Sequence, residues 1–416
     1  MRISTITMFE QSLNSMASQQ ASFLKIGQQI ASGSRVVNPS DDPQAASRAV
    51  GVAQAAAVNQ QYADARISAR NSLGQEESVL NSVADAITSV KTRLVQGANG
   101  TLSDADRSSL ASEIRGVYEA MLGQANAADG NGRYLFGGFK DNSPPFIKDP
   151  ATGAVRFIGD TGMTKLKVDS SRLMANSDSG EDIFLRVHSS AKPIAVAAAS
   201  NQGSVSFVGP NVVDSAAANF GDAFAIEFDG AGGYQVFSPP SSATASATGT
   251  YDPESTQEQS IAFNGLSLKL DGAPAAGDRI AVSRAQEVSY GSAPEDSGPN
   301  LFRTLENVLA VLDKPASTDA ERAALQNTIT TSMRELDNAL DNVLTTRASV
   351  GARLNELDVL DTVGANRELN YAQTLSDLVD LDYYKAISEY ALRLVGLQAA
   401  QKSFLDIQKL SLFDLM

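Results

Sequence analysis

Two stripes of mostly apolar residues, one near each end of the chain, follow the alternating three- and four-residue spacing of a helix face. The first stripe comprises Ile6, Phe9, Leu13, Met16, Phe23 and Ile30, with Gln20 and Gly27 in the same row. The second comprises Ile387, Ala391, Leu394, Leu397, Phe404 and Ile407, with Gln401 in its row. A helix with such a stripe needs a partner to cover it. We therefore predict that the two end helices meet.

Two further stretches carry an apolar residue at every seventh position, which predicts two long helices. The positions are Leu73, Leu80, Ile87 and Leu94 in the first stretch, and Ile329, Leu336, Val343, Val350 and Leu357 in the second. Asp42 and Pro43 predict the start of the first helix, as cap and first helical residue, and the pattern continues to about Gln96. Thr318 and Glu321 fit a capping box at the start of the second. Helices of this length are typical of a coiled coil or bundle rod.

Between about Arg133 and Pro299 the pattern changes to short runs that alternate apolar and polar residues. Such runs, separated by Gly, Pro, Asp, Asn and Ser, are typical of strands joined by turns. The predicted strands are 134–136, 154–158, 184–188, 204–208, 224–228 and 266–272. Ser238–Thr250 is rich in Ser, Ala, Thr and Pro and predicts a flexible loop. About 165 residues suffice for one sizeable β domain or two small ones.

The order of these elements predicts an α+β chain. Its fold would be a long antiparallel helical bundle or coiled-coil rod built from both chain ends, with an inserted β-rich domain. We expect a terminal helical assembly domain at 1–42 plus 372–416, a long-helix rod at 43–133 plus 300–371, and a β-rich outer domain at 134–299. The outer domain can hold two small β subdomains.

The end stripes and the inner ladders differ in what we expect to cover them. For the long helices we favour packing inside one subunit. A single pair of end helices has few partners, so we predict that neighbouring subunits cover it and that the ends become ordered on assembly. The residues assigned to subunit assembly are therefore Ile6, Phe9, Leu13, Met16, Phe23, Ile30, Ile387, Leu394, Leu397, Phe404 and Ile407.

Composition narrows the classes of function. The formal net charge is −15 and the pI about 4.6. A nucleic-acid binder carries a basic stripe that releases counterions, and an anionic membrane also attracts basic residues, so both partners are disfavoured. The chain has no cysteine and a single histidine, His188, so disulfides and multi-histidine metal sites are excluded.

Candidate catalytic residues are few. Neighbouring carboxylates occur at Asp41 with Asp42, at Glu181 with Asp182, and at Asp380 with Asp382. Such pairs are common in caps and turns, whereas catalytic carboxylates must converge in a cleft. We assign no catalytic, cofactor-binding or metal-binding residue, and we expect no cofactor and no enzymatic activity.

The N-terminal residues lack the apolar core of a cleavable signal peptide, and no run of about 18 apolar residues predicts a membrane span. If the protein leaves the cell, we expect it to do so by a route that leaves its N-terminus uncut.

Several local motifs resemble the flagellin family. They are Met1–Thr5, Ile30–Ala46 with its Asn-Pro-Ser-Asp-Asp-Pro sequence, Asn131–Gly138, Arg347–Leu354 and Leu375–Asp377. The residues from Asn38 to Pro43 and the closing Ser411–Met416 are more similar to the hook–filament junction branch of the family than to filament flagellin. The resemblance covers roughly residues 1–140 and 300–416.

The resemblance implies an extracellular structural component of the bacterial flagellum that joins hook to filament. Such a protein is exported through the flagellar type III apparatus and self-associates in a ring or tube. Its implied partners are the other hook–filament junction protein, flagellin and an export chaperone bound at the C-terminal helix. The terminal helices would form the inner tube, and the β domain the outer surface.

Two alternatives stay open at the level of sequence. One is filament flagellin itself. The other, from a different class, is a secreted adhesin whose β-rich domain binds a ligand, although such a protein would not need matched end stripes. An enzyme is a distant third.

Overall fold

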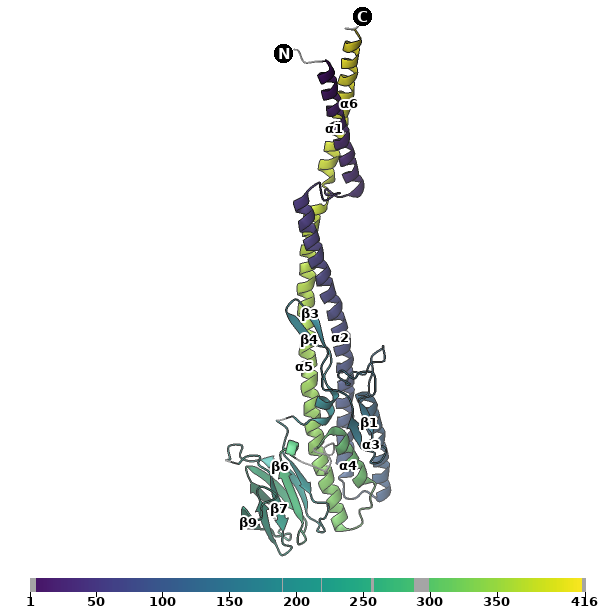
Figure 1. Cartoon of the computed structure of the whole chain (residues 1–416). Helices are drawn as coiled ribbons and strands as arrows, with labels where there is room; N and C mark the ends of the chain where they lie inside the picture. The colour runs from purple at the N-terminus through teal and green to yellow at the C-terminus, as the bar shows by residue number, and fades with distance from the viewer. Residues whose placement is uncertain (1–4, 189, 218, 256–257, 288–298, 414–416) are drawn as a thin grey trace. The chain divides into compact units, whose positions relative to one another are not determined.

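A computed structural model describes residues 5–188, 190–217, 219–255, 258–287 and 299–413 (Figure 1). Inside the terminal helices, the side chains of residues 5, 6, 8 and 407–413 lie outside the description. The chain divides into two compact units, residues 1–65 with 358–416 and residues 66–357. We call them the terminal unit and the central unit. The three-part division drawn from the sequence stays a prediction.

The terminal unit consists of four helical segments. Helices α1 (Thr5–Ser32) and α6 (Tyr383–Phe413) lie side by side, which confirms that the two chain ends meet (Figure 1). The first part of α2 (Pro43–Gly97) and the last part of α5 (Asp319–Val379) complete the unit. The predicted caps are present, because Gly33 ends α1 with φ +71° and the Asp42 carboxylate accepts the Ala45 N–H at 3.0 Å.

The boundary between α5 and α6 differs from the prediction. From the apolar pattern alone we expect the last helix to begin at about Asp377, but α5 continues to Val379 and α6 begins at Tyr383. The reason is the Asp382 side chain, which accepts the Lys385 N–H at 3.1 Å and caps α6. A capping carboxylate ends the run of helical hydrogen bonds even where apolar periodicity continues.

In the central unit, the seven-residue ladders form the core of the α2–α5 pair, as predicted. Every ladder residue of α2 is fully buried, and those of α5 are at most 2% exposed. Glu77 of α2 pairs with Arg347 of α5 at 2.7 Å, and Lys91 pairs with Asp337. The partners run in opposite directions along the two helices, so α2 and α5 are antiparallel.

Two shorter helices, α3 (Asp104–Ala125) and α4 (Leu301–Leu312), pack on each other in the same unit. Ser103 and Asp106 cap α3 reciprocally. Helix α3 ends at Ala125 because the Asn126 amide leaves the helix. That amide donates to the Phe146 carbonyl at 2.8 Å and accepts the Phe146 N–H at 2.9 Å.

Among the described residues between α3 and α4 there are twelve strands. They are β1 (Phe146–Lys148), β2 (Val155–Phe157), β3 (Lys165–Asp169), β4 (Arg172–Ala175), β5 (Ile194–Ala197), β6 (Ser206–Val212), β7 (Phe224–Phe228), β8 (Gly233–Phe237), β9 (Ala247–Thr250), β10 (Gln259–Phe263), β11 (Leu266–Asp271) and β12 (Arg279–Ser283). Strands β1–β2 and β3–β4 are antiparallel hairpins. The others form a five-stranded sheet, ordered β5-β12-β7-β8-β9, and a three-stranded sheet, ordered β10-β11-β6.

The two larger sheets share one hydrophobic core and form a β-sandwich. Phe207 of β6, Phe224 of β7 and Leu268 of β11 lie in the same buried cluster. Alternate residues of each strand point into this core, as in other sandwiches. The α+β class with an inserted β-rich domain is therefore confirmed.

Three strand-level predictions were wrong in part. Residues 184–188 do not form a strand, because Ile183 and Phe184 are both buried in the π-helical turn η1 (Glu181–Leu185) instead of alternating. Residues 134–136 contribute a single bridge to Ala128 and no strand. The predicted loop 238–250 ends in β9, which pairs with β8. The short helix η2 (Ala285–Glu287) follows β12.

Polar side chains of α5 hold the sandwich. Asn327 donates to the Val205 carbonyl at 2.9 Å and accepts the Phe207 N–H at 3.0 Å. Thr331 donates to the Ala195 carbonyl of the edge strand β5 at 2.7 Å. Asn338 pairs in the same two-sided way with the backbone of Lys192. These buried hydrogen bonds satisfy backbone groups at two strand edges that would otherwise be open.

A buried carboxyl interrupts the α2 ladder. Glu76 is 1% exposed and accepts the Asp178 N–H at 3.2 Å through one oxygen, while its other oxygen has no hydrogen-bond partner. Burial, with the nearby Asp178 carboxylate, raises the pKa of Glu76 to about 8, although Arg353 opposes the shift. Glu76 is therefore mostly protonated at neutral pH.

We predict that Leu336→Ala destabilises the central unit far more than Leu344→Ala. Leu336 is fully buried on the α5 ladder, whereas Leu344 of the same helix is 43% exposed. Truncating a buried leucine costs about 2–5 kcal/mol, because apolar contact is lost and a cavity remains. Guanidinium denaturation followed by circular dichroism measures both changes. Equal losses in the two variants would contradict the ladder as core.

We predict that the protein loses stability between about pH 5 and pH 9 and that Glu76→Gln reduces this loss. The folded pKa of Glu76 lies above its ordinary value of 4.5, so its contribution is fully present below pH 4.5 and disappears as the pH rises through about 8. The loss is on the order of a few kcal/mol. Denaturation midpoints at pH 5, 7 and 9 test this, with Asp85→Asn, an exposed change on α2, as the control. An unchanged pH slope in Glu76→Gln would refute the assignment.

Candidate assembly surface

The α1–α6 pair has a fixed antiparallel register. The rings of Phe9 and Phe404 lie 5.3 Å apart, and those of Phe23 and Tyr390 stack at 4.6 Å. The two ring pairs are fourteen residues apart on both helices. Small residues let the helices approach closely, because Gly27 lies against the Tyr390 ring and Gly396 faces the Gln19 amide. The pair is therefore a specific contact.

The contact buries very little. Among the described side chains of α1 and α6, only Ile26 and Ala386 are buried, at 7% and 6% exposure. The ladders of the central unit, in contrast, are almost completely inaccessible. Two helices alone cannot enclose their apolar residues, which agrees with the expectation of a thin core.

The predicted assembly residues fall into three groups. Met16, Phe23, Ile30, Leu397 and Phe404 are half-buried. Phe9, Leu13, Ile387 and Leu394 are exposed, between 37% and 56%. Ile6 and Ile407 lie outside the described side chains. The structure thus brings Phe9, Phe23 and Phe404 into ring contacts between the helices and leaves Ile387 and Leu394 open.

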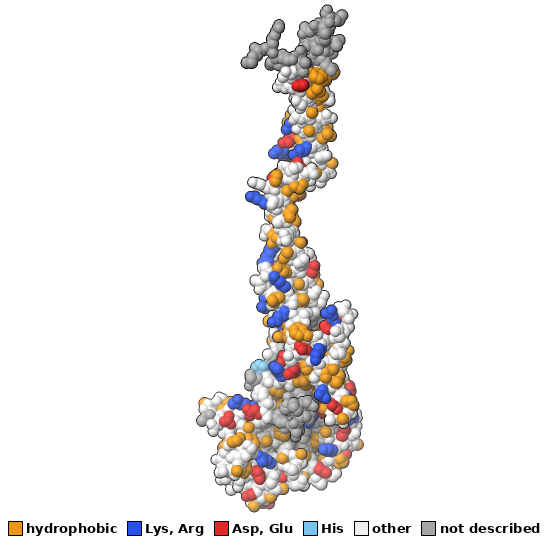
Figure 2. Space-filling view, viewed as in Figure 1, with side chains coloured by type: hydrophobic (Ala, Val, Ile, Leu, Met, Phe, Trp, Pro, Cys, Tyr) orange, Lys and Arg blue, Asp and Glu red, His pale blue; other side chains and the backbone are white. Residues whose placement is uncertain are grey.

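The sequence pattern missed a second apolar face on α6. Tyr384, Leu392, Val395 and Leu405 are 86%, 72%, 62% and 54% exposed, and Leu24 of α1 is 57% exposed. Figure 2 shows hydrophobic side chains on the exposed surface of this unit. The three- and four-residue spacing identifies a single stripe and does not show that a helix is apolar on several sides. Apolar residues counted on every side of the predicted helix would have revealed this face. We call Leu392, Val395 and Leu405 the open face of α6.

The other half of the terminal unit is also thinly covered. Val50 of α2 and Leu369 of α5 are each 69% exposed. The buried Asn59 amide donates to the Gly364 carbonyl at 3.0 Å and links the two helices there. Exposed apolar residues on both helical pairs exceed the scattered single residues expected of a monomer surface.

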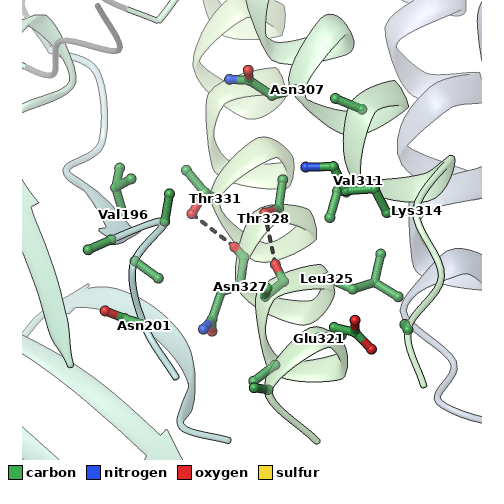
Figure 3. A pocket seen from close by; sticks show the side chains of 18 of the residues that line it. Val196, Asn201, Asn307, Val311, Lys314, Glu321, Leu325, Asn327, Thr328 and Thr331 are labelled. Carbon is green, nitrogen blue, oxygen red and sulfur yellow. Dashed lines mark hydrogen bonds between the residues drawn. The ribbon is translucent and has the colours of Figure 1, made fainter. Parts of the chain in front are cut away.

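A cleft of about 420 Å³ lies in the central unit between β5, α4 and α5 (Figure 3). Asn327, Thr328 and Thr331 of α5 line one side, and Val196 and Asn201 lie on the sandwich side. Two of these side chains already bind the sandwich backbone, so they serve the attachment described above.

Two properties of the described residues bear on other chemistry. None of them forms a group of three or more His, Cys, Asp or Glu side chains that could hold a metal ion. Within the same ranges, every helix falls short of the length and apolarity that crossing a membrane requires.

The chain is similar to known flagellar proteins. Residues 3–141 match the bacterial flagellin N-terminal helical region. Flagellar hook-associated protein 3 of Escherichia coli is 34% identical over 416 residues, which is 100% of this chain and 99% of that protein. The protein of the same name from Salmonella typhimurium gives the same identity and coverage.

Solved structures give the same result. The crystal structure of Xanthomonas campestris FlgL has a TM-score of 0.67 at 28% identity and covers 78% of this chain and 99% of that one. Hook-associated protein 3 from Legionella pneumophila has a TM-score of 0.67 at 25% identity and covers 79% of this chain and 98% of that one. The resemblance drawn from the end motifs is confirmed, and this chain belongs to the flagellar hook-associated protein 3 family.

Proposed function

We propose that the protein is a structural axial component of the bacterial flagellum that joins hook to filament through packing of its terminal helices between subunits. The observation that carries the proposal is the α1–α6 pair, which has a defined ring register but leaves most of its apolar side chains exposed. Helices that are aligned but uncovered are suited to association with further helices.

The energetics favour this use. Fully burying one leucine or valine side chain contributes about 1.5–3 kcal/mol, and the open face of α6 offers three such side chains. Association costs about 4–15 kcal/mol in lost freedom of motion, so several contacts per subunit must act together. A ring or tube, in which each subunit has neighbours on both sides, supplies them.

The family membership supports the choice among partners and locations. We propose self-association in a ring or tube, with the other hook–filament junction protein on the hook side and flagellin on the filament side. We also propose that an export chaperone covers the C-terminal helix before assembly, because exposed apolar residues of α6 would otherwise aggregate. The site of action is then the extracellular flagellum, and the role is non-enzymatic.

Filament flagellin is the less favoured alternative. The 34% identical relatives, matched over the whole chain, carry the name flagellar hook-associated protein 3. Seeded growth of long homofilaments from the purified protein would favour flagellin.

Deleting residues 388–416 is expected to abolish junction assembly while the central unit stays folded. The deletion removes most of α6, whereas the central unit keeps its own ladders and sandwich core. In cells, we expect intact hooks, no filaments and flagellin shed into the medium, as seen by electron microscopy and immunoblotting. Thermal melting of the purified variant serves as the folding control. Motility that survives the deletion would refute the proposed function.

Leu392→Asp is expected to weaken assembly without changing the fold. Leu392 is 72% exposed, so a charge there costs nothing in the free chain but must be desolvated when a neighbour covers it. Loss of one apolar contact corresponds to about a tenfold to hundredfold weaker association. Gln398→Asp places the same charge at a polar exposed position of α6 and is the matched control. Equal filament counts in the two variants would exclude the open face from assembly.

A further inference from the structure

The segment Gly33–Asp42 between α1 and α2 does more than connect two helices. We propose that it forms a closed clasp with residues 378–382, that Arg35 is the positioning residue of this clasp, and that the clasp stays closed in the assembled protein. The inference rests on the proposed assembly function and specifies which residue sets the geometry of the terminal unit. All of its contacts lie within that unit.

A short antiparallel backbone pairing forms the floor of the clasp. Ser34 and Asp380 are bridge partners. The Arg35 N–H donates to the Val379 carbonyl at 2.7 Å, and the Leu381 N–H donates to the Gly33 carbonyl at 3.0 Å. Because the loop after α1 pairs with the turn between α5 and α6, the two connections of the unit are locked to each other.

The Arg35 side chain binds two different helices. Its Nη2 donates to the Leu378 carbonyl near the end of α5 at 2.6 Å, and its Nη1 donates to Asp42 Oδ2 at 3.0 Å. The other Asp42 oxygen caps α2 through the Ala45 N–H. A cation at the C-terminal end of α5 and an anion at the N-terminal end of α2 both suit the helix dipoles. The guanidinium therefore joins the end of one long helix to the start of the other.

Further contacts bring α1 and α6 into the clasp. Gln29 of α1 donates to the Arg35 carbonyl at 2.6 Å, and Lys25 of α1 pairs with Asp41 at 2.8 Å. Gly33 has φ +71°, and a Cβ atom there would lie 3.0 Å from the Tyr383 hydroxyl at the start of α6. The Arg35 backbone and side chain thus bind α1, α2 and α5, and the adjacent Gly33 and the backbone pairing reach α6.

The small energy of the Arg35–Asp42 ion pair indicates that Arg35 positions the helices and does not stabilise the fold. The Arg35 and Asp42 side chains are 44% and 36% exposed, and an ion pair this open contributes about 0–1 kcal/mol. Arg35 can therefore add little to the stability of the whole chain. Its two bonds nevertheless fix the direction in which the α1–α6 pair leaves the long helices. In an assembly, the α1–α6 pair and the long helices must contact neighbouring subunits at the same time. A loose link between these two parts lowers the effective concentration at which the second part meets its neighbour.

The absence of cysteine in the natural chain gives a direct test of the closed clasp. In a Ser34→Cys, Asp380→Cys double variant, the two thiols replace the bridge partners and should form a disulfide rapidly in mild oxidant. Adding Arg35→Ala should slow this cross-linking several-fold, and Arg35→Lys should restore part of the rate. Arg48→Ala, an exposed arginine of α2, should leave the rate unchanged. The thermal melting of all variants should stay within a few degrees.

A cross-linking rate that does not respond to Arg35→Ala would overturn the positioning role. Slow cross-linking in the Ser34→Cys, Asp380→Cys double variant itself would overturn the closed clasp, because the pairing would then be open in the free chain. Neither outcome depends on assembly, so both are separate from a failure of the proposed function.

The second part of the test asks whether the clasp is closed in the junction. Purified variants are added with flagellin to cells that carry bare hooks, and filaments are counted. The oxidised double variant should support as many filaments as the reduced one, Arg35→Ala should support several-fold fewer, and the disulfide should rescue Arg35→Ala. Loss of filaments on oxidation, restored by reduction, would show that the clasp must open. Failure of the disulfide to rescue Arg35→Ala would exclude geometry as the cause.

Discussion

The central unit depends on helix α5, which packs on α2 and also binds the inserted region. One face of α5 carries the apolar ladder that packs on α2, and a neighbouring face carries Asn327, Thr331, Asn338 and Asn342. The four polar side chains are buried and bind backbone groups of the inserted region, including carbonyls at Asp182 and Ile183 in the case of Asn342. The hydrophobic effect has no direction, but hydrogen bonds from a buried amide do, so this second face fixes where the inserted domain sits.

The terminal unit also contains a pair of antiparallel helices, but this pair buries much less of its apolar surface. The central ladders are closed, because each of their residues is at most 2% exposed. The α1–α6 pair has ring contacts that set a register, but among its described side chains most apolar residues stay exposed. A pair of this kind gains little from burial in the free chain, which agrees with the proposal that neighbours cover it. Specific alignment and incomplete burial together are what a subunit of an assembly needs.

Much of the helical architecture could be predicted from the sequence, because capping and periodicity act locally. Asp42 and Thr318 cap their helices as predicted, and Glu321 completes the capping box of α5. The side of α6 that is covered by α1 was harder to predict, and the assembly residues stay a prediction. Ile387 and Leu394 belong to the predicted stripe but lie open, while Ala386 is buried and Tyr390 stacks on Phe23 of α1. A helix that is apolar on several sides has no unique stripe in sequence, so only a partner helix shows which side is covered.

The sequence by itself determined the starts of α2 and α5 at their caps Asp42 and Thr318, the two seven-residue ladders, the meeting of the chain ends and the family. These depend on neighbours within a few turns or on the period of one helix. Only the tertiary structure decided that Arg35 joins α2 to α5, that buried amides of α5 hold the sandwich edge, and that Glu76 is a protonated buried acid. Each of these joins groups far apart in the chain, and neither spacing nor composition encodes which distant backbone atom a polar side chain will reach.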